Sequence, residues 1–253
     1  MKLTFLGTGS GRISPAAGHS SLLFRNNNSS VLIDCGEGTS KNLLSGAIPL
    51  NEIESIVISH FHADHIAGLP GLLTQYKLLG RTEALNIFVP APLKELLITM
   101  LNSFFLFTES FRFPLNIKQY EYSVEAILFD GLTMSAAKNT HIVNKHNVAS
   151  IPQECFVSSS FRFTAGGKSI LYTADIGSGE DLFLFDGPFD YIISETTHIQ
   201  PEKLLQALVR YEPETIFLTH IDDEEKLNGW HSHLDKKIKR YFRIAEEGME
   251  LEV

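Results

Sequence analysis

Four side chains of the kinds that bind transition metals fall within six residues of the segment Ser59-His60-Phe61-His62-Ala63-Asp64-His65. Imidazole nitrogen and carboxylate oxygen are zinc ligands, with manganese and iron as alternatives. The segment lies between an apolar run at 56–58 and a predicted helix that begins near Ile66. A polar surface turn in that place has no need of three imidazoles and an aspartate. We therefore interpret the segment as a metal-binding loop at the end of a strand.

This loop alone cannot complete two coordination spheres, so further ligands are expected at the ends of other strands. Three polar residues each stand just past a short β-like run, namely His141, Asp175 and His220. We expect all three side chains to lie at one edge of the sheets, beside the loop.

The remaining polar candidates have less specific patterns. Asp34 follows a predicted strand, so it either holds the second ring nitrogen of a metal-bound histidine or is a plain turn residue. His231 and His233 are interpreted as surface residues, and the sequence assigns no role to His19 or His146.

The elements that would position these residues form two runs of strands and helices. The first run is predicted to contain strands at 2–6, 20–24, 30–34, 57–59 and 87–89 and helices at 39–46, 66–80 and 92–106. The second is predicted to contain strands at 116–120, 126–129, 132–137, 155–164 and 169–173, then strand 190–194, helix 201–211, strand 215–219 and helix 233–246. This alternation predicts an α+β fold of stacked sheets with helices outside. No long linker or short-period repeat interrupts residues 1–253, which favours a single domain.

The composition limits the classes of partner and location. Of the 253 residues, 43% are hydrophobic, which is enough for a large core, and no apolar stretch is long enough to span a membrane. The formal net charge of −9 disfavours general binding to polyanions. Cys35 and Cys155 cannot make a disulfide framework, which favours a reduced, cytoplasmic location. Cys35 is expected to be a small buried packing residue.

Two clusters of side chains have alternative interpretations. Basic residues near the C-terminus form either a solvated helix face, which we favour, or a phosphate contact. These residues are Lys236, Lys237, Lys239, Arg240 and Arg243. A group of aromatic residues belongs either to the core, which we favour, or to a pocket wall or dimer contact. These residues are Phe104, Phe105, Phe107, Phe111 and Phe113.

Six motifs together resemble the metallo-β-lactamase-fold superfamily of metallohydrolases. They are Leu3-Thr4-Phe5-Leu6-Gly7-Thr8-Gly9-Ser10, Leu32-Ile33-Asp34-Cys35-Gly36-Glu37-Gly38, the loop from His60 to His65, Asn139-Thr140-His141, Tyr172-Thr173-Ala174-Asp175 and Leu218-Thr219-His220. These motifs extend over nearly the whole chain. The resemblance implies an αββα sandwich, in which two mixed β-sheets pack face to face with helices on the outside.

The resemblance also implies two divalent metal ions, with Zn²⁺ as the first choice and Mn²⁺ or iron as alternatives. One ion would be held by His60, His62 and His141, the other by Asp64, His65 and His220, and Asp175 would bridge the two. Two such ions, roughly 3.5–4 Å apart, share a hydroxide that is nucleophilic at neutral pH. Asp64 would also orient this hydroxide, which gives it a catalytic role.

The segment Ser194-Glu195-Thr196-Thr197-His198 resembles the ribonuclease Z-like and phosphodiesterase branch of this superfamily. In that branch a glutamate supports a histidine that donates a proton to the leaving oxygen, which implies these catalytic roles for Glu195 and His198. A carboxylate can raise the proton affinity of an imidazole enough to make it a general acid. The alternative is a histidine at a helix N-terminus beside capping threonines.

The expected function is that of a phosphodiesterase that uses a metal-bridging hydroxide on a small-molecule or nucleotide-like ester. Ribonuclease Z-type cleavage at transfer-RNA 3′ ends is the first alternative. The acidic balance disfavours RNA, as does the short span between His141 and Asp175, where the resemblance implies a long arm in transfer-RNA-processing members. An iron-dependent oxidoreductase on the same fold is the second alternative, and Asp64 with the complete second ligand set disfavours it. A homodimer is left open.

Overall fold

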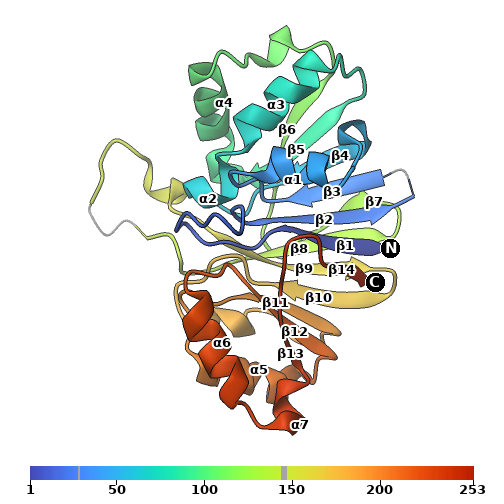
Figure 1. Ribbon diagram of the computed structural model, residues 1–253. Helices are drawn as coiled ribbons and strands as arrows, with labels where there is room; N and C mark the ends of the chain where they lie inside the picture. Colours follow the sequence, from blue (N-terminus) through green and yellow to red (C-terminus); the bar gives the residue numbers. More distant parts are fainter. Residues whose placement is uncertain (28, 144–146) are drawn as a thin grey trace.

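Two seven-stranded β-sheets pack face to face, and helices lie on the outer side of each sheet (Figure 1). The computed structural model describes residues 1–27, 29–143 and 147–253, so His146 lies outside the described residues. This arrangement confirms the α+β, αββα sandwich that the sequence predicts.

The first sheet has the strand order β14-β1-β2-β3-β4-β5-β6. Its strands are β1 (Lys2–Gly7), β2 (Ser21–Asn26), β3 (Ser29–Ile33), β4 (Ile53–Val57), β5 (Leu85–Pro90), β6 (Leu115–Tyr120) and β14 (Glu250–Glu252). The sheet is mixed, because β14 to β3 pair antiparallel and β3 to β6 pair parallel. Its helices are α1 (Thr39–Ser45), the one-turn α2 (Ala63–Ile66), α3 (Leu69–Leu78) and α4 (Lys94–Ser103).

The second sheet has the strand order β13-β12-β11-β10-β9-β8-β7. Its strands are β7 (Glu125–Phe129), β8 (Leu132–Lys138), β9 (Ser159–Ala165), β10 (Lys168–Tyr172), β11 (Tyr191–Glu195), β12 (Thr215–Thr219) and β13 (Phe242–Ile244). It is also mixed, antiparallel from β7 to β10 and parallel from β10 to β13. Helices α5 (Pro201–Tyr211), α6 (Glu224–His233) and α7 (Lys236–Lys239) lie on its outer side (Figure 1).

The core fills the space between the sheets and the space beneath each helical layer. Phe5 of the first sheet and Phe161 of the second belong to the cluster between the sheets. Successive residues of β3 divide between layers, because Val31 and Ile33 join that inner cluster while Leu32 packs with the helices. A strand buried on both faces is apolar along its whole length. Polar side chains from such strands can serve a site only at the strand ends.

The C-terminal part of the chain differs from the predicted helix at 233–246. The structure has α6 ending at His233, one helical turn at α7, and the strand β13 in place of the rest of the helix. Phe242 of β13 pairs with Ile216 of β12 and is 2% exposed. Sheet pairing and burial of this aromatic residue outweigh the helix propensity of the basic run that precedes it. The short edge strand β14 was also not predicted.

Two further expectations fail locally. The strand predicted at 155–164 begins only at Ser159, because Gln153–Cys155 forms the short 3₁₀-helix η4. The aromatic group belongs to the core at Phe113, but three members are exposed, so the core assignment is wrong for them. They are Phe104 at 58%, Phe105 at 77% and Phe107 at 43% exposure. These rings leave the core because α4 ends at Ser103 and the chain turns, with a positive φ of 57° at Phe105.

Two surface expectations can be compared with the structure. The basic residues near the C-terminus lie on an exposed face, with only one of them half-buried, as expected for a solvated surface. They are Lys236, Lys237, Arg240 and Arg243, with Lys239 half-buried. Over the described ranges, no helix is long and apolar enough to cross a lipid bilayer.

Candidate metal centre

Three strand ends turn sharply out of the sheets beside the predicted metal-binding loop. Asp34 follows β3 with a φ of 58°, and His220 follows β12 with a φ of 54°. Ala174, just before Asp175 and two residues past β10, has a φ of 47°. Residues other than glycine rarely adopt this left-handed conformation, and such positions cluster at active sites. The strained turns direct the polar side chains of three separate strands toward one place.

The loop between β4 and α2 is held by close backbone contact with the segment that follows β3. The amide of Cys35 donates to the carbonyl of His65 at 2.8 Å, and the amide of Gly68 donates to the carbonyl of Cys35 at 2.9 Å. A Cβ atom at Gly36 would lie 2.3 Å from the carbonyl oxygen of Asp64. Glycine is therefore required at this position, because it lets the two segments approach closely enough to position the loop.

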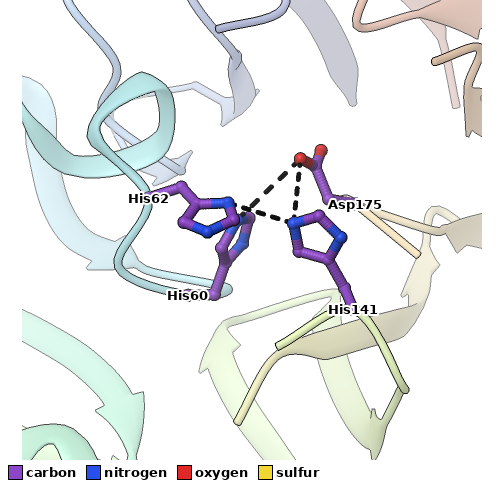
Figure 2. A group of neighbouring side chains, drawn as sticks. All are labelled: His60, His62, His141 and Asp175. Carbon is purple, nitrogen blue, oxygen red and sulfur yellow. Dashed lines mark hydrogen bonds and ion pairs between the residues drawn. The ribbon is translucent and has the colours of Figure 1, made fainter. Parts of the chain in front are cut away.

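The first group of donor atoms comes from His60, His62, His141 and Asp175, whose ligand atoms all lie within 4.8 Å of one another. Figure 2 shows the three rings and the carboxylate facing a common centre. Nε2 of His141 lies 3.0 Å from Nδ1 of His62 and 3.4 Å from Oδ2 of Asp175. Nε2 of His60 lies 3.9 Å from the same carboxylate oxygen.

The second group comes from Asp64, His65, Asp175 and His220, again with all ligand atoms within 4.8 Å. Nε2 of His220 lies 3.0 Å from Oδ2 of Asp64. Nε2 of His220 and Nε2 of His65 each lie 3.1 Å from Oδ1 of Asp175. Asp175 therefore presents one carboxylate oxygen to each group. The structure brings together all seven residues that the sequence singled out as ligands.

The donor set fits cations, because several of its buried atoms have no hydrogen-bond partner within the protein. These atoms are Nε2 of His60, Nε2 of His65 and Oδ1 of Asp175. Leaving a buried polar group unsatisfied costs roughly 1–3 kcal/mol. A cation at each group would satisfy these atoms, as expected of donors arranged to hold metal ions.

The pKa shifts of three histidines and one aspartate of the site suit the same interpretation. Burial lowers the pKa of His60 and of His62, and it lowers the pKa of His141 to about 4. Burial acts to raise the pKa of Asp64, but His220 and His65 outweigh it and bring that pKa down to about 2. Neutral imidazoles and ionised carboxylates are the forms that bind metal.

Asp34 supports His65 from behind the site. Its Oδ2 accepts a hydrogen bond from Nδ1 of His65 at 2.8 Å, and it also accepts from the hydroxyls of Ser59 and Tyr172 at 2.9 and 3.1 Å. Burial acts to lower the pKa of His65, but the carboxylates of Asp175 and Asp34 outweigh it and raise that pKa well above its usual value. Of the two interpretations of Asp34, the geometry is that of a partner to a ligand histidine.

The Glu195–His198 pair lies beside the first donor group. Oε1 of Glu195 is 3.2 Å from Nδ1 of His198, and the His198 ring centroid is 4.8 Å from that of His141. Glu195 is 1% exposed, and its Oε2 accepts the backbone amides of Thr197 and His198. The contact with Glu195 raises the pKa of His198. The threonines of this segment do not cap α5, which begins after Gln200 without a side-chain cap, so the capping interpretation is wrong.

Sequence reasoning missed two supporting residues. The side-chain amide of Asn139 donates to the carbonyl of Asp175 at 2.8 Å, and its Oδ1 accepts the backbone amide of His141 at 3.1 Å. The hydroxyl of Thr197 lies 3.1 Å from Nδ1 of His220. Asn139 and Thr197 lie in the same motifs as His141 and His198. Their nearness in sequence to these candidate site residues is the signal that could have identified them.

The remaining histidines lie outside both donor groups in the described part of the chain. His233 is exposed, in agreement with the sequence, whereas His231 is half-buried, with Nε2 3.2 Å from the carbonyl of Phe242. Nδ1 of His19 is buried without a hydrogen-bond partner. None of these three is placed to share in holding a cation.

A profile of the family described as Anti-Pycsar protein Apyc1 matches residues 1–227 of the chain. The matched range contains every residue of the two donor groups and the Glu195–His198 pair.

Among curated relatives, the protein named ribonuclease Z from Prochlorococcus marinus (strain MIT 9301) is 40% identical over 134 residues. The match covers 51% of this chain and 42% of that protein, so less than half of the relative's length is represented. The aligned identity supports a common origin for the matched part.

Solved structures extend the likeness to the whole chain. The metallo-beta-lactamase fold protein YhfI from Bacillus subtilis superposes with a TM-score of 0.75 at 21% identity, covering 99% of this chain and 98% of that one. The short form of human tRNase Z superposes with a TM-score of 0.72 at 21% identity, covering 100% of this chain and 99% of that one. Such identities show the fold alone. Together with the curated relatives, they confirm the resemblance to the metallo-β-lactamase fold and its ribonuclease Z-like branch.

Proposed function

The chain belongs to the Anti-Pycsar protein Apyc1 family, and from that membership and its site we propose that it is a phosphodiesterase dependent on two divalent cations. One observation carries the proposal: two groups of metal donors share Asp175, and the Glu195–His198 pair lies beside them. His60, His62 and His141 would hold one cation. Asp64, His65 and His220 would hold the other. Zn²⁺ suits these nitrogen and oxygen donors best, and Mn²⁺ or iron are the alternatives.

Two cations held in this way would supply a nucleophile from water at neutral pH and neutralise charge on the phosphoryl group. Among the described residues near the donor groups, the thiol of Cys35 does not compete with such a nucleophile. Cys35 is fully buried, and burial raises the pKa of its thiol to about 12. Asp64, a member of the second donor group, would orient the attacking water.

The proton for the leaving oxygen is assigned to His198. Glu195 binds Nδ1 of the His198 ring and favours the protonated imidazole. Nε2 of His198 is therefore the nitrogen that can donate a proton to the leaving oxygen. His198 is 38% exposed, which is compatible with contact to a bound ester. Catalytic roles are therefore proposed for Asp64, His198 and Glu195.

The substrate is proposed to be a small-molecule or nucleotide-like phosphodiester. The formal net charge of −9 opposes a large polyanion. Strands β9 and β10 form a hairpin joined by only Gly166 and Gly167, so this part of the span between His141 and Asp175 has no room for an RNA-gripping arm. The identity with a ribonuclease Z keeps transfer-RNA cleavage as the second candidate. The family description also supports a role against a Pycsar system.

The test is turnover by protein loaded with Zn²⁺ or Mn²⁺ on three substrates: a nitrophenyl phosphodiester, a dinucleotide and a precursor transfer RNA. We expect both small diesters to be hydrolysed and a chelator to abolish turnover. A kcat/KM for the precursor far above that for the dinucleotide would favour the ribonuclease Z alternative. Absence of turnover on every diester after metal loading would refute the proposed function.

A further inference from the structure

A pocket of about 150 Å³ lies between α5 and α6, on the outer side of the second sheet (Figure 1). Its apolar lining comes from both helices and from the segment before α5. The apolar residues are Ile199, Pro201, Leu204, Leu227 and Trp230. Of the described residues that line it, none is one of the seven metal donors, Glu195 or His198. We call it the Trp230 pocket.

The Trp230 pocket is formed by the packed core and does not depend on a ligand for its shape. Leu204 and Ile199 are 2% and 8% exposed, and Leu227 and Trp230 pack against the same core cluster. The ring of Trp230 also contacts Phe242, with 5.4 Å between ring centroids and an angle of 83° between the planes. Preformed apolar pockets with a few polar groups are typical small-molecule sites.

The size of the pocket selects the apolar group that it can hold. A dry apolar cavity of roughly 150 Å³ holds benzene, so the Trp230 pocket has room for a phenyl ring or a branched aliphatic group. Aromatic rings gain additional stabilisation when they pack on one another, which favours a ligand that places such a group against Trp230.

The rim of the pocket carries charges of both signs, from Asp222, Asp223 and Lys226 at the start of α6. Asp222 is engaged by another loop, because it accepts the hydroxyl of Ser10 at 3.2 Å and lies 3.9 Å from the guanidinium of Arg12. Asp223 uses only Oδ1, which accepts the amide of Lys226 at 2.9 Å. Among the described residues, neither Oδ2 of Asp223 nor the ammonium of Lys226 has an ion-pair partner. Both charges are therefore available to a ligand.

The wall of the pocket also includes two threonines that support the second donor group. The hydroxyl of Thr196 donates to the carbonyl of Thr219 at 3.2 Å, and the hydroxyl of Thr197 donates to the carbonyl of His220 at 2.9 Å. A ligand in the pocket therefore contacts the segment that holds His220, although it does not reach the donor atoms.

We propose that the Trp230 pocket binds an apolar α-amino acid. The apolar side chain packs against Trp230, the ammonium group faces Asp223 and the carboxylate faces Lys226, so each charge of the ligand meets its opposite at the rim. This site goes beyond the proposed function and does not rest on it.

The experiment compares L-phenylalanine with phenethylamine, which lacks the carboxylate, and with 3-phenylpropionate, which lacks the ammonium group. Trp230 is the only tryptophan of the chain, so its emission reports binding at this pocket. We expect the Kd of L-phenylalanine to be roughly two- to fivefold lower than that of either analogue, as for two ion pairs at an exposed rim. Tighter binding of either analogue, or no saturable change with any of the three ligands, would overturn the proposal.

Two variants at exposed positions test the two charges separately. Lys226→Gln should raise the Kd of L-phenylalanine and of 3-phenylpropionate roughly two- to fivefold without weakening phenethylamine. Asp223→Asn should weaken L-phenylalanine and phenethylamine without weakening 3-phenylpropionate, and asparagine still caps α6. Equal losses for all three ligands in either variant would contradict the assignment of the charges.

Helix α7 supplies matched controls, because its cap repeats the same arrangement away from the pocket. Asp235 accepts the amide of Lys237 at 2.8 Å, and neither residue lines the Trp230 pocket. Asp235→Asn and Lys237→Gln should leave all three Kd values unchanged. A loss of L-phenylalanine binding in these controls equal to that in the rim variants would refute the assignment to this pocket.

Inorganic phosphate separates the Trp230 pocket from the metal centre. In Zn²⁺-loaded protein, saturating phosphate should not displace L-phenylalanine, because the two ligands occupy different sites. Competition between them would place the amino acid at the donor groups and overturn the proposal.

Discussion

Nδ1 of His65 donates a hydrogen bond to Oδ2 of Asp34 at 2.8 Å, and both side chains are fully buried. The two residues come from different segments, since Asp34 directly follows β3 and His65 lies in α2. The contact fixes the ring so that Nε2 faces the second donor group, where it lies 3.1 Å from Asp175. A buried carboxylate therefore orients a candidate metal ligand from outside both donor groups.

Asp34→Asn should weaken metal binding about 10–100-fold, because the amide no longer holds the ring in one tautomer. Asparagine tolerates the positive φ of this position, so the backbone need not change. The measurement is competition for Zn²⁺ with a chromophoric chelator. Asp186→Asn is the control, because Asp186 is fully exposed. Unchanged zinc affinity in Asp34→Asn would show that the contact serves only packing.

Metal-loaded protein should contain two ions per chain, because each donor group offers four ligand residues with Asp175 shared. Elemental analysis after loading and removal of free metal gives the stoichiometry. One ion per chain after exhaustive loading would refute the dinuclear assignment. A single iron per chain would instead support the oxidoreductase alternative.

His62→Ala and Asp64→Ala should each lower kcat/KM on a phosphodiester by at least about 10²-fold while leaving the fold intact, because neither side chain belongs to an apolar cluster. The circular dichroism spectrum should therefore stay unchanged while kcat/KM falls. His233→Ala is the matched control, since it removes an exposed imidazole outside both groups. Wild-type rates in both site variants would mean that the catalytic centre lies elsewhere.

His198→Ala should slow a diester with an alkoxide leaving group roughly 10²–10⁴-fold and one with a nitrophenolate leaving group far less, because a stable anion needs no proton. Glu195→Gln should act in the same direction more weakly, by removing the carboxylate that raises the pKa of His198. The measurement is kcat/KM on two diesters with the same phosphoryl centre. Equal losses on both would assign His198 to positioning of the substrate.

Stability should depend on acid pH through Asp190, whose carboxylate accepts from the amide of Ser169 at 2.8 Å and from the Lys168 ammonium at 3.0 Å. Burial acts to raise the pKa of Asp190, but these contacts outweigh it and lower the pKa below its usual 3.8. A lowered pKa means that the folded state prefers the ionised form. The stabilisation that ionised Asp190 contributes is therefore complete above about pH 4. It is lost as the pH falls through the pKa of Asp190 in the folded state.

Asp190→Asn should accordingly reduce the free energy of unfolding by about 1 kcal/mol at pH 7 and by less at pH 3. Urea unfolding of the variant and the wild type at both pH values measures this difference. Asp186→Asn, at a fully exposed position, should change neither value. A difference in the free energy of unfolding between the two proteins that is larger at pH 3 than at pH 7 would contradict this prediction.

The sequence by itself determined which donor side chains the candidate metal centre contains. The spacing from His60 to His65 places four donors in one loop, and the strand-end positions of His141, Asp175 and His220 follow from apolar runs that stop just before them. The alternation of strand and helix patterns also predicted stacked sheets with helices outside, and the resemblance implied the αββα sandwich. The single-domain division and the cytoplasmic location stay predictions.

Only the tertiary structure decided how the side chains of separate strand ends are placed relative to one another. The chain positions could not show that Asp175 presents one oxygen to each donor group, or that Asp34 holds His65, since both facts depend on the relative placement of separate strand ends. The same dependence explains the failures. Phe242 became part of an edge strand because β12 was there to pair with it, and Phe105 is exposed because the chain turns away from the core after α4. The local sequence pattern determines which side chains of a segment are apolar enough to be buried. The neighbouring elements in the fold determine which of those side chains are in fact buried.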